Sequence, residues 1–148
     1  MELQISNYRA VNEMPSKTEI RKAVSETLRR CGRKPSDPYE LSIVFTGKEE
    51  IREVNRKYRN INRATDVISF AFCEGEGACF APFLLGDIMV CPEIISIHEK
   101  KYGSGLKREM IFVIIHGLLH LLGYDHDTAA KRKAMREKET EIMDVLFK

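Results

Sequence analysis

Apolar residues recur at helical spacing in the first part of the chain. Between Ile20 and Cys31 they return every three or four positions, which predicts an amphipathic helix with one buried face. Ser16 and Glu19 have the spacing of a capping box, in which each side chain bonds the backbone N–H of the other residue. Gly32 tolerates the left-handed conformation in which many helices end. The sequence therefore predicts a first helix that starts after Ser16 and closes at Gly32.

Short runs of apolar and β-branched residues predict four strands. These runs cover residues 2–6, 41–46, 66–72 and 84–91. Between the second and third runs, Thr46 and Glu49 have the spacing of another capping box, so we expect a second helix there. Its apolar face is predicted to hold Ile51, Val54 and Tyr58.

The second half of the chain is predominantly helical in pattern. Pro92 suits the first position of a helix that reaches about Tyr102. The long apolar stretch of residues 104–122 predicts a buried central helix, and Asp127 or Thr128 is expected to cap a last helix. Its apolar positions are Met135, Ile142, Met143 and Leu146.

These elements predict an α+β fold. A chain of 148 residues with 43% hydrophobic residues can build one core, so we expect residues 1–148 to form a single domain. A small mixed sheet of four strands is expected to pack against helices that include the central one. The chain shows neither an apolar run of membrane-spanning length nor a signal peptide, which predicts a cytoplasmic protein with no membrane partner.

The four cysteines give little information about function. Cys31, Cys73, Cys79 and Cys91 are scattered and form no CxxC pair. In a reducing compartment they are expected to be buried or neutral thiols, and zinc binding by them is the less favoured interpretation.

Charge is uneven along the chain although the net charge is only +2. Basic residues outnumber acidic ones between Lys17 and Lys34 and again between Arg52 and Arg63. Charge alone favours solvated helix faces at both places. The alternative is that phosphate-binding side chains gather near a functional site.

Three of the four histidines lie in the segment HGLLHLLGYDH, from His116 to His126. On a helix, His116 and His120 share one face because they are four residues apart. Gly123 then allows the chain to turn, and His126 can return as a third ligand. A lone histidine on an apolar helix is usually no ligand, but this concentration predicts a metal site. Three imidazoles with one open position are typical of catalytic zinc, so we expect one Zn²⁺ per chain.

The same spacing occurs in metalloproteases with the motif HExxHxxGxxH, but one residue differs. There the residue after the first histidine is a glutamate that acts as general base. Here that residue is Gly117, which cannot take a proton from water. Peptide hydrolysis by that mechanism is therefore disfavoured.

The histidine segment resembles the signature of the YbeY family, bacterial metal-dependent endoribonucleases implicated in ribosomal RNA maturation. Other residues agree in order and spacing: Asn55, Tyr58, Arg59, TDVISF at 65–70 and LGDI at 85–88. The resemblance covers essentially the whole chain. Two departures are Ala64 and Ala71, where the family usually has proline, and both concern the stiffness of a loop and a strand.

The resemblance implies a zinc-dependent, single-strand-specific endoribonuclease for ribosomal RNA processing and ribosome quality control. It implies His116, His120 and His126 as metal ligands and Arg59 and His116 as catalytic residues. A guanidinium can make two hydrogen bonds to a phosphate, although the residue pattern alone favours a solvated charge at a helix end for Arg59. Precursor ribosomal RNA, the ribosome and ribosomal proteins are the implied partners, and no DNA partner is expected.

Three aspartates, Asp66, Asp87 and Asp125, lie near these motifs. Asp125 could orient the imidazole of His126 as a carboxylate behind a metal ligand. Asp66 and Asp87 could serve in the site or act only as caps or turn residues. His98, in a charged segment, is expected to face solvent and to lie outside the site.

The main rival interpretation is a non-catalytic ribosome-assembly factor that binds RNA and holds a structural zinc. The open coordination position argues against a purely structural metal, whereas the missing general base argues against catalysis. The nucleophile could be water or an RNA 2′-OH, and the sequence does not select between them. A metallopeptidase-like hydrolase rests on the histidine spacing alone.

Overall fold

Four strands of the chain form one mixed β-sheet. The computed structural model describes residues 1–9, 13–73, 81–103 and 105–148. The strands are β1 (Glu2–Ser6), β2 (Glu40–Phe45), β3 (Val67–Ala71) and β4 (Leu84–Val90). The sheet order is β1-β2-β4-β3, in which β1, β2 and β4 are parallel and β3 is antiparallel to β4 at one edge. The predicted small mixed sheet is confirmed.

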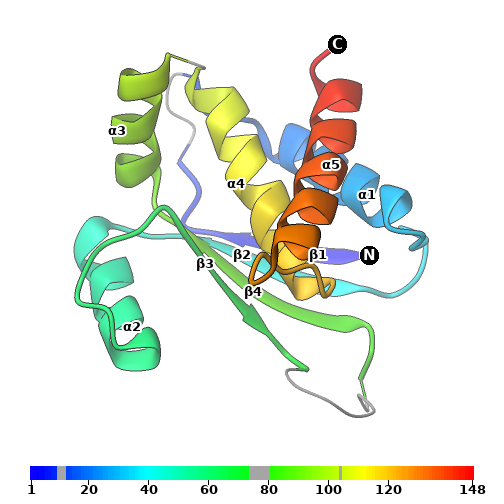
Figure 1. Ribbon diagram of the computed structural model, residues 1–148, viewed down its shortest axis with the longest axis horizontal. Coiled ribbons are helices and arrows are strands. Elements are labelled where there is room, and N and C mark those ends of the chain that lie inside the picture. The colour runs from blue at the N-terminus through cyan, green and yellow to red at the C-terminus, as the bar shows by residue number, and fades with distance from the viewer. Residues whose placement is uncertain (10–12, 74–80, 104) are drawn as a thin grey trace.

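Within the described residues, five helices cover the two faces of this sheet unequally. They are α1 (Lys17–Arg30), α2 (Lys48–Arg59), α3 (Pro92–Tyr102), α4 (Leu106–Leu121) and α5 (Ala129–Leu146). In Figure 1, α1, α3, α4 and α5 lie on one side of the sheet and α2 lies on the other. The fold is therefore α+β, as the pattern predicts.

The central helix α4 is the hub of the main core. It packs against β3 and β4 below it and against α1, α3 and α5 around it. Its buried residues include Met110, Ile114 and Leu118, none of which is accessible to solvent. Because this apolar surface is buried by the protein itself, burial of these side chains supplies the main stabilisation of the helix that carries two of the histidines.

A second, smaller core lies under α2 on the opposite face of the sheet. It is formed by Ile51, Ile68 and Cys91. Tyr58 does not join it as predicted: its side chain is 64% exposed, and its ring meets the edge of Phe70 at a centroid distance of 5.6 Å. Ile51 and Asn55 are the buried residues of α2, so the buried part of the helix ends before this position.

Helix ends agree with most of the predicted signals. Ser16 and Glu19 form the capping box of α1, Pro92 opens α3, and Thr128 caps α5 by accepting a hydrogen bond from the backbone N–H of Lys131. The box predicted at Thr46 is wrong. The cap of α2 is Gly47, and the hydroxyl of Thr46 donates to Glu50 at 3.2 Å instead.

Two further predictions concern the cysteines and membrane spans. Cys31 and Cys91 are free thiols, as expected, whereas Cys73 is disulfide-bonded, so the prediction of a neutral thiol is wrong there. The cysteines form no CxxC pair, so the sequence gave no signal of this bond. Cys79 lies outside the described residues, as does most of the loop between β3 and β4.

Among the described residues, no helix combines the length and apolarity needed to cross a bilayer.

Candidate metal centre

The histidines of the motif converge at the C-terminal end of α4. The Nε2 atoms of His116 and His120 lie 3.2 Å apart. The helix ends at Leu121, and Gly123 adopts a φ of +100°, which reverses the chain as predicted. His126 then returns to the site, where its ring centroid lies 5.0 Å from that of His120 and 6.1 Å from that of His116. The helix thus supplies two imidazoles, and the following turn supplies the third.

His116 is held from behind by a carboxylate that the sequence analysis missed. Its Nδ1 lies 2.9 Å from Oε1 of Glu139, a buried residue of α5. The ring of Phe112 stacks on that of His116, with an interplanar angle of 27° and a centroid distance of 6.2 Å. A signal for Glu139 was present in the sequence, because a glutamate stands among the apolar positions of the last helix.

His126 has a looser setting than the two helical histidines. Its side chain is 60% exposed, and its Nδ1 lies 3.4 Å from Oδ1 of Asp125. The same oxygen accepts a hydrogen bond of 2.7 Å from the backbone N–H of His126. Within the described residues, one group of potential ligand atoms lies within 4.8 Å of one another, and it consists of His120, Asp125 and His126. Asp125 therefore stands as a possible ligand as well as a partner of His126.

The electrostatics favour a neutral imidazole at His120. Burial is the largest cause that lowers the pKa of His120, and the neighbouring rings of His116 and His126 lower it further. A metal ligand must be the neutral imidazole. His120 is therefore in the ligating form at neutral pH.

The donor set fits a zinc ion. Tetrahedral zinc with nitrogen ligands at about 2.0–2.1 Å requires those nitrogens to lie roughly 3.3 Å apart. The two helical Nε2 atoms, 3.2 Å apart, meet this requirement. His126 and Asp125 lie on the side where further ligands would be needed, and both are exposed enough to adjust. Among the described residues, the donors within 4.8 Å of one another are thus those of His120, Asp125 and His126, and His116 adjoins this group through His120.

Strand β3 approaches the histidine helix at the glycine inside the motif. A Cβ at Gly117 would lie 2.9 Å from Oγ of Ser69 and 3.0 Å from a methyl group of Ile88. The hydroxyl of Ser69 donates a 3.0 Å hydrogen bond to the carbonyl of Gly117. Gly117 therefore serves close packing between β3 and α4, which answers why a helix-weakening residue occurs here.

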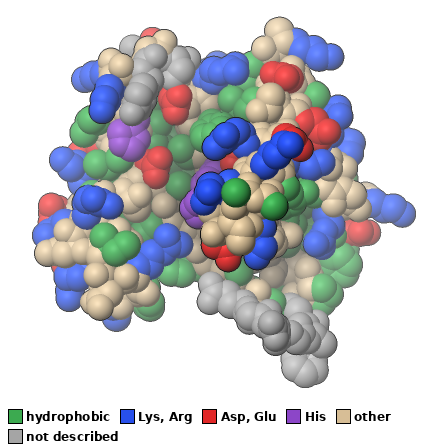
Figure 2. Space-filling view, in the orientation of Figure 1, with side chains coloured by type: hydrophobic (Ala, Val, Ile, Leu, Met, Phe, Trp, Pro, Cys, Tyr) green, Lys and Arg blue, Asp and Glu red, His purple; other side chains and the backbone are tan. Residues whose placement is uncertain are grey.

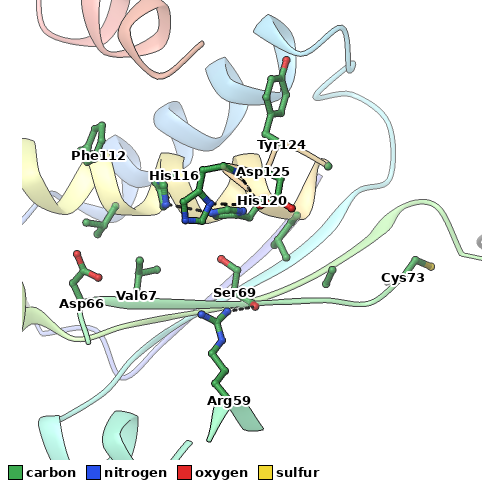
Figure 3. A pocket seen from close by; sticks show the side chains of 15 residues that line it. Arg59, Asp66, Val67, Ser69, Cys73, Phe112, His116, His120, Tyr124 and Asp125 are labelled. Atoms are coloured by element: carbon green, nitrogen blue, oxygen red, sulfur yellow. Dashed lines mark hydrogen bonds and ion pairs between the residues drawn. The ribbon is translucent and has the colours of Figure 1, made fainter. Parts of the chain in front are cut away.

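Arg59 reaches the same region from the opposite side of β3. It is the last residue of α2, which ends at Asn60 in the left-handed conformation. Buried Asn55 fixes the turn that follows by donating a 2.8 Å hydrogen bond to the carbonyl of Arg63. The guanidinium of Arg59 donates to the carbonyl of Ser69 at 3.4 Å. Figure 3 shows Arg59 below β3 and the histidines above it.

These side chains line one open pocket of about 840 Å³. Arg59, Ser69 and the three motif histidines all contribute to its walls. Figure 2 shows Lys and Arg side chains beside a hollow on this face, in which a histidine is visible. A guanidinium and a cluster of imidazoles in one pocket can bind an anion and a cation together.

Two other basic residues of α2 pair with acidic residues of the same helix. Arg52 pairs with Glu49 at 2.8 Å and Arg56 with Glu53 at 2.9 Å, both on the exposed helix surface. Such exposed pairs contribute little to stability. The interpretation as a solvated face therefore holds for these two arginines, and Arg59 is the residue of α2 that lines the pocket.

The remaining aspartates and His98 occupy different places. Asp66 lines the pocket at the start of β3, where it accepts a hydrogen bond from the hydroxyl of Thr65 at 3.3 Å. Asp87 lies on the other face of the sheet, in a separate pocket with Glu2 and Glu40. His98 is exposed, as predicted, and lies 3.9 Å from Asp66.

Comparison with known proteins supplies the family relationship. A family model described as Endoribonuclease YbeY matches residues 4–146. The chain is 44% identical over 114 residues to the Endoribonuclease YbeY of Staphylococcus carnosus strain TM300, a match that spans 75% of this chain and 74% of that protein. It is 42% identical over 113 residues to the protein of the same name from Staphylococcus aureus strain JH9, covering 73% of each.

A solved structure also has this fold. The solution structure of TM1509 from Thermotoga maritima superimposes with a TM-score of 0.66 at 24% sequence identity. The match covers 98% of this chain and 89% of that chain.

Proposed function

The chain belongs to the YbeY family of endoribonucleases, and from this premise we propose that it cleaves RNA in the pocket between β3 and α4. One observation carries the proposal: Arg59 and the histidines 116, 120 and 126 line the same pocket from opposite sides of β3. Cleavage of a phosphodiester needs a group that binds the anionic phosphate and a group that activates the reaction. The pocket offers side chains for both.

His116, His120 and His126 are the proposed ligands of one divalent ion, for which zinc suits the nitrogen donors best. When bound, such an ion lowers the pKa of water and polarises a phosphoryl oxygen. The 3.2 Å separation of the helical Nε2 atoms and the neutral state of His120 support this ligand set. Asp125 is a candidate to replace or support His126, because its carboxylate belongs to the same group of atoms.

Arg59 is the proposed electrophilic residue. Its planar guanidinium can donate two hydrogen bonds to the phosphate and stabilise the charge that develops on it. The present bond to Ser69 is long, at 3.4 Å, and the side chain is exposed, so little is lost when the guanidinium turns to a substrate. Arg59 and His116 are the residues that we assign to the catalytic machinery.

This site lacks the glutamate that serves as proton acceptor in a metalloprotease. Gly117 follows His116, and a side chain there would collide with Ser69 and Ile88, so this position has no room for a carboxylate. The attacking oxygen belongs either to water or to the 2′-OH of the RNA, and in both cases the bond from phosphorus to the departing nucleotide breaks. A peptidase mechanism that relies on a glutamate at this position is correspondingly disfavoured.

The proposed substrate is single-stranded ribosomal RNA precursor. A single strand can bend a phosphate toward Arg59 and the histidines, whereas an A-form duplex holds its phosphates at fixed spacing. We place the protein's role in ribosomal RNA maturation and ribosome quality control, in the cytoplasm and in contact with the ribosome or its proteins, with residues 1–148 acting as one catalytic domain.

The test is a cleavage assay with matched single-stranded and duplex fragments of ribosomal RNA. We expect metal-loaded protein to cut the single strand preferentially, chelation to stop cleavage and added zinc to restore it. The matched control variant is His98→Ala, which removes an exposed histidine outside the pocket lining. Metal-independent cleavage, or metal-loaded protein that binds RNA without cutting it, would contradict the proposal, and the second result would favour an assembly factor with a structural zinc.

A further inference from the structure

Glu139 is a charged residue in a place where charge is rare. The buried polar residues of the described parts of the chain are Thr27, Thr46, Asn55 and Glu139, and Glu139 alone among them carries a carboxylate. Its relative exposure is 8%. A buried carboxylate is strongly unfavourable unless hydrogen bonds compensate for lost hydration. The hydrogen bond to Nδ1 of His116, at 2.9 Å, provides that compensation.

The position of Glu139 is fixed by its helix. Met135, Ile142 and Met143 lie four residues before and three and four residues after it, and all three are buried in the main core. On a helix these positions share one face with Glu139. The apolar contacts of α5 therefore hold the carboxylate behind His116, and its position does not depend on a mobile loop.

The hydrogen bond determines which nitrogen of His116 carries the proton. A carboxylate accepts hydrogen bonds, so the proton of the neutral imidazole lies on Nδ1. The lone pair of Nε2 then points toward Nε2 of His120, 3.2 Å away. Phe112 stacks on the ring and restricts its rotation. Residues outside the histidine motif thus set both the tautomer of His116 and the direction of its Nε2 lone pair.

The turn histidine, His126, differs from His116 in the exposure of its carboxylate partner. Asp125, the carboxylate beside His126, is its direct neighbour in sequence and is 51% exposed, against 11% for the side chain of Glu139. Glu139 also borders a separate pocket of about 360 Å³ between α4 and α5, which Arg108 and Arg136 line together with Glu109 and Asp144. The charges around this pocket are therefore mixed in sign.

We propose that Glu139 is a positioning residue, which presents the Nε2 lone pair of His116 to a metal ion. The inference rests on the proposed metal-dependent function, since a metal is what the positioned lone pair would bind. Carboxylates that orient a ligating histidine typically change metal affinity about 10- to 100-fold when removed. Through this contact α5 takes part in the site although it contributes no ligand.

The test compares Glu139→Leu and Glu139→Gln with the matched control Glu137→Gln, which removes the same charge from an exposed position of α5. Zinc affinity is measured by competition with a chromophoric chelator. We expect about 10- to 100-fold weaker binding in Glu139→Leu. Glu139→Gln should fall between it and the wild type, because the amide oxygen still accepts from Nδ1 without the charge. The control should bind zinc like the wild type.

Two further readouts separate positioning from a merely structural role. Leucine suits the apolar stripe, so Glu139→Leu should keep its thermal unfolding midpoint within a few degrees while losing zinc affinity. In metal-free protein, nitrogen NMR of His116 should show the proton on Nδ1 in the wild type and in Glu139→Gln, and a mixture of tautomers in Glu139→Leu. If Glu139→Leu does not fold, the zinc affinity of Glu139→Gln tests the proposal. Weaker binding than in the wild type supports it, and wild-type binding overturns it.

Wild-type zinc affinity in both Glu139 variants, or an unchanged tautomer in Glu139→Leu, would overturn the inference. Neither readout uses RNA. Metal-loaded wild type that fails to cut RNA would therefore defeat the proposed function and leave the positioning of His116 by Glu139 standing.

Discussion

The helical histidines and the turn histidine of the motif are held in opposite ways. His116 lies on α4, its side chain is 29% exposed, and a buried carboxylate of another helix holds its Nδ1. His126 lies beyond the end of α4, is 60% exposed, and contacts the adjacent Asp125. The same segment of sequence therefore produces one rigid half and one adjustable half of the candidate metal site.

This difference indicates that the helix and the turn contribute differently to the candidate metal site. Rigid side chains on a helix give a precise distance between donor atoms, here 3.2 Å between His116 and His120. Exposed side chains on a turn can move toward an ion or away from it as a substrate enters. We therefore expect variants of the helical half to have larger effects than variants of the turn.

The largest expected effect on zinc binding comes from His120→Ala. His120 pairs with His116 and also belongs to the group with Asp125 and His126, so its loss affects both halves. Loss of one of about four ligands should weaken zinc binding on the order of 100-fold. Zinc titration and RNA cleavage measure the effect. His98→Ala is the control, and equal zinc affinity in the two variants would contradict the ligand assignment.

Gly117→Ala tests the rigid half by forcing β3 away from α4. The added Cβ would meet Ser69 and Ile88, and such overpacking costs about 1–3 kcal/mol. Better helix propensity offsets roughly 1 kcal/mol of this cost. We expect thermal unfolding some degrees lower and a cleavage rate reduced on the order of 100-fold, because Arg59 is displaced with β3.

A double variant sharpens that test. Ser69→Ala removes one of the two close contacts, so Gly117→Ala should be less destabilising in a Ser69→Ala background than in the wild type. Unfolding free energies of the four proteins give the coupling. If the effects of the two substitutions on the unfolding free energy simply add, the close approach of Ser69 to Gly117 is not the cause of the destabilisation.

Substitutions in the turn half of the site should weaken zinc binding less than those in the helical half. His126→Ala is expected to reduce zinc affinity by roughly tenfold, and Asp125→Ala by less, because each of these neighbouring side chains can partly replace the other. The double variant should lose more affinity than either single one. An effect of His126→Ala as large as that of His120→Ala would show that the turn is as rigid as the helix.

The smallest expected effect is that of metal removal on the fold. The apolar face of α4 is buried by β3, β4, α1 and α5, so the helix does not depend on an ion for its stability. Circular dichroism after chelation should retain the helical signal, while cleavage is lost. Unfolding on chelation would instead indicate a structural metal and strengthen the assembly-factor interpretation.

Local signals in the sequence predicted much of this arrangement. The spacing of His116 and His120, the turn at Gly123 and the capping box at Ser16 each depend on residues near one another in the chain. The direction of Glu139 toward His116 depends on how α5 docks on α4, which no local pattern encodes. The capping box predicted at Thr46 is wrong because α2 begins one residue later, after Gly47.

The pairing of Arg59 with the histidines also needed the three-dimensional fold. A charge at the end of a helix is ordinarily solvated, and only the crossing of β3 between α2 and α4 brings Arg59 to the pocket. Family resemblance rather than residue chemistry pointed to it. At Gly117, the contacts that a Cβ would make with Ser69 and Ile88 identify close packing as the reason for a glycine.

The most direct test of the account is single-turnover cleavage of a single-stranded ribosomal RNA fragment by Arg59→Ala, with its metal content determined on the same preparation. The matched control is Arg56→Ala, which removes an exposed charge from the same helix outside the pocket lining. We predict about one metal per chain in every protein and, for Arg59→Ala alone, a cleavage rate lower by on the order of 100- to 1,000-fold. A folded, metal-loaded Arg59→Ala protein that cuts as fast as the wild type would contradict the account.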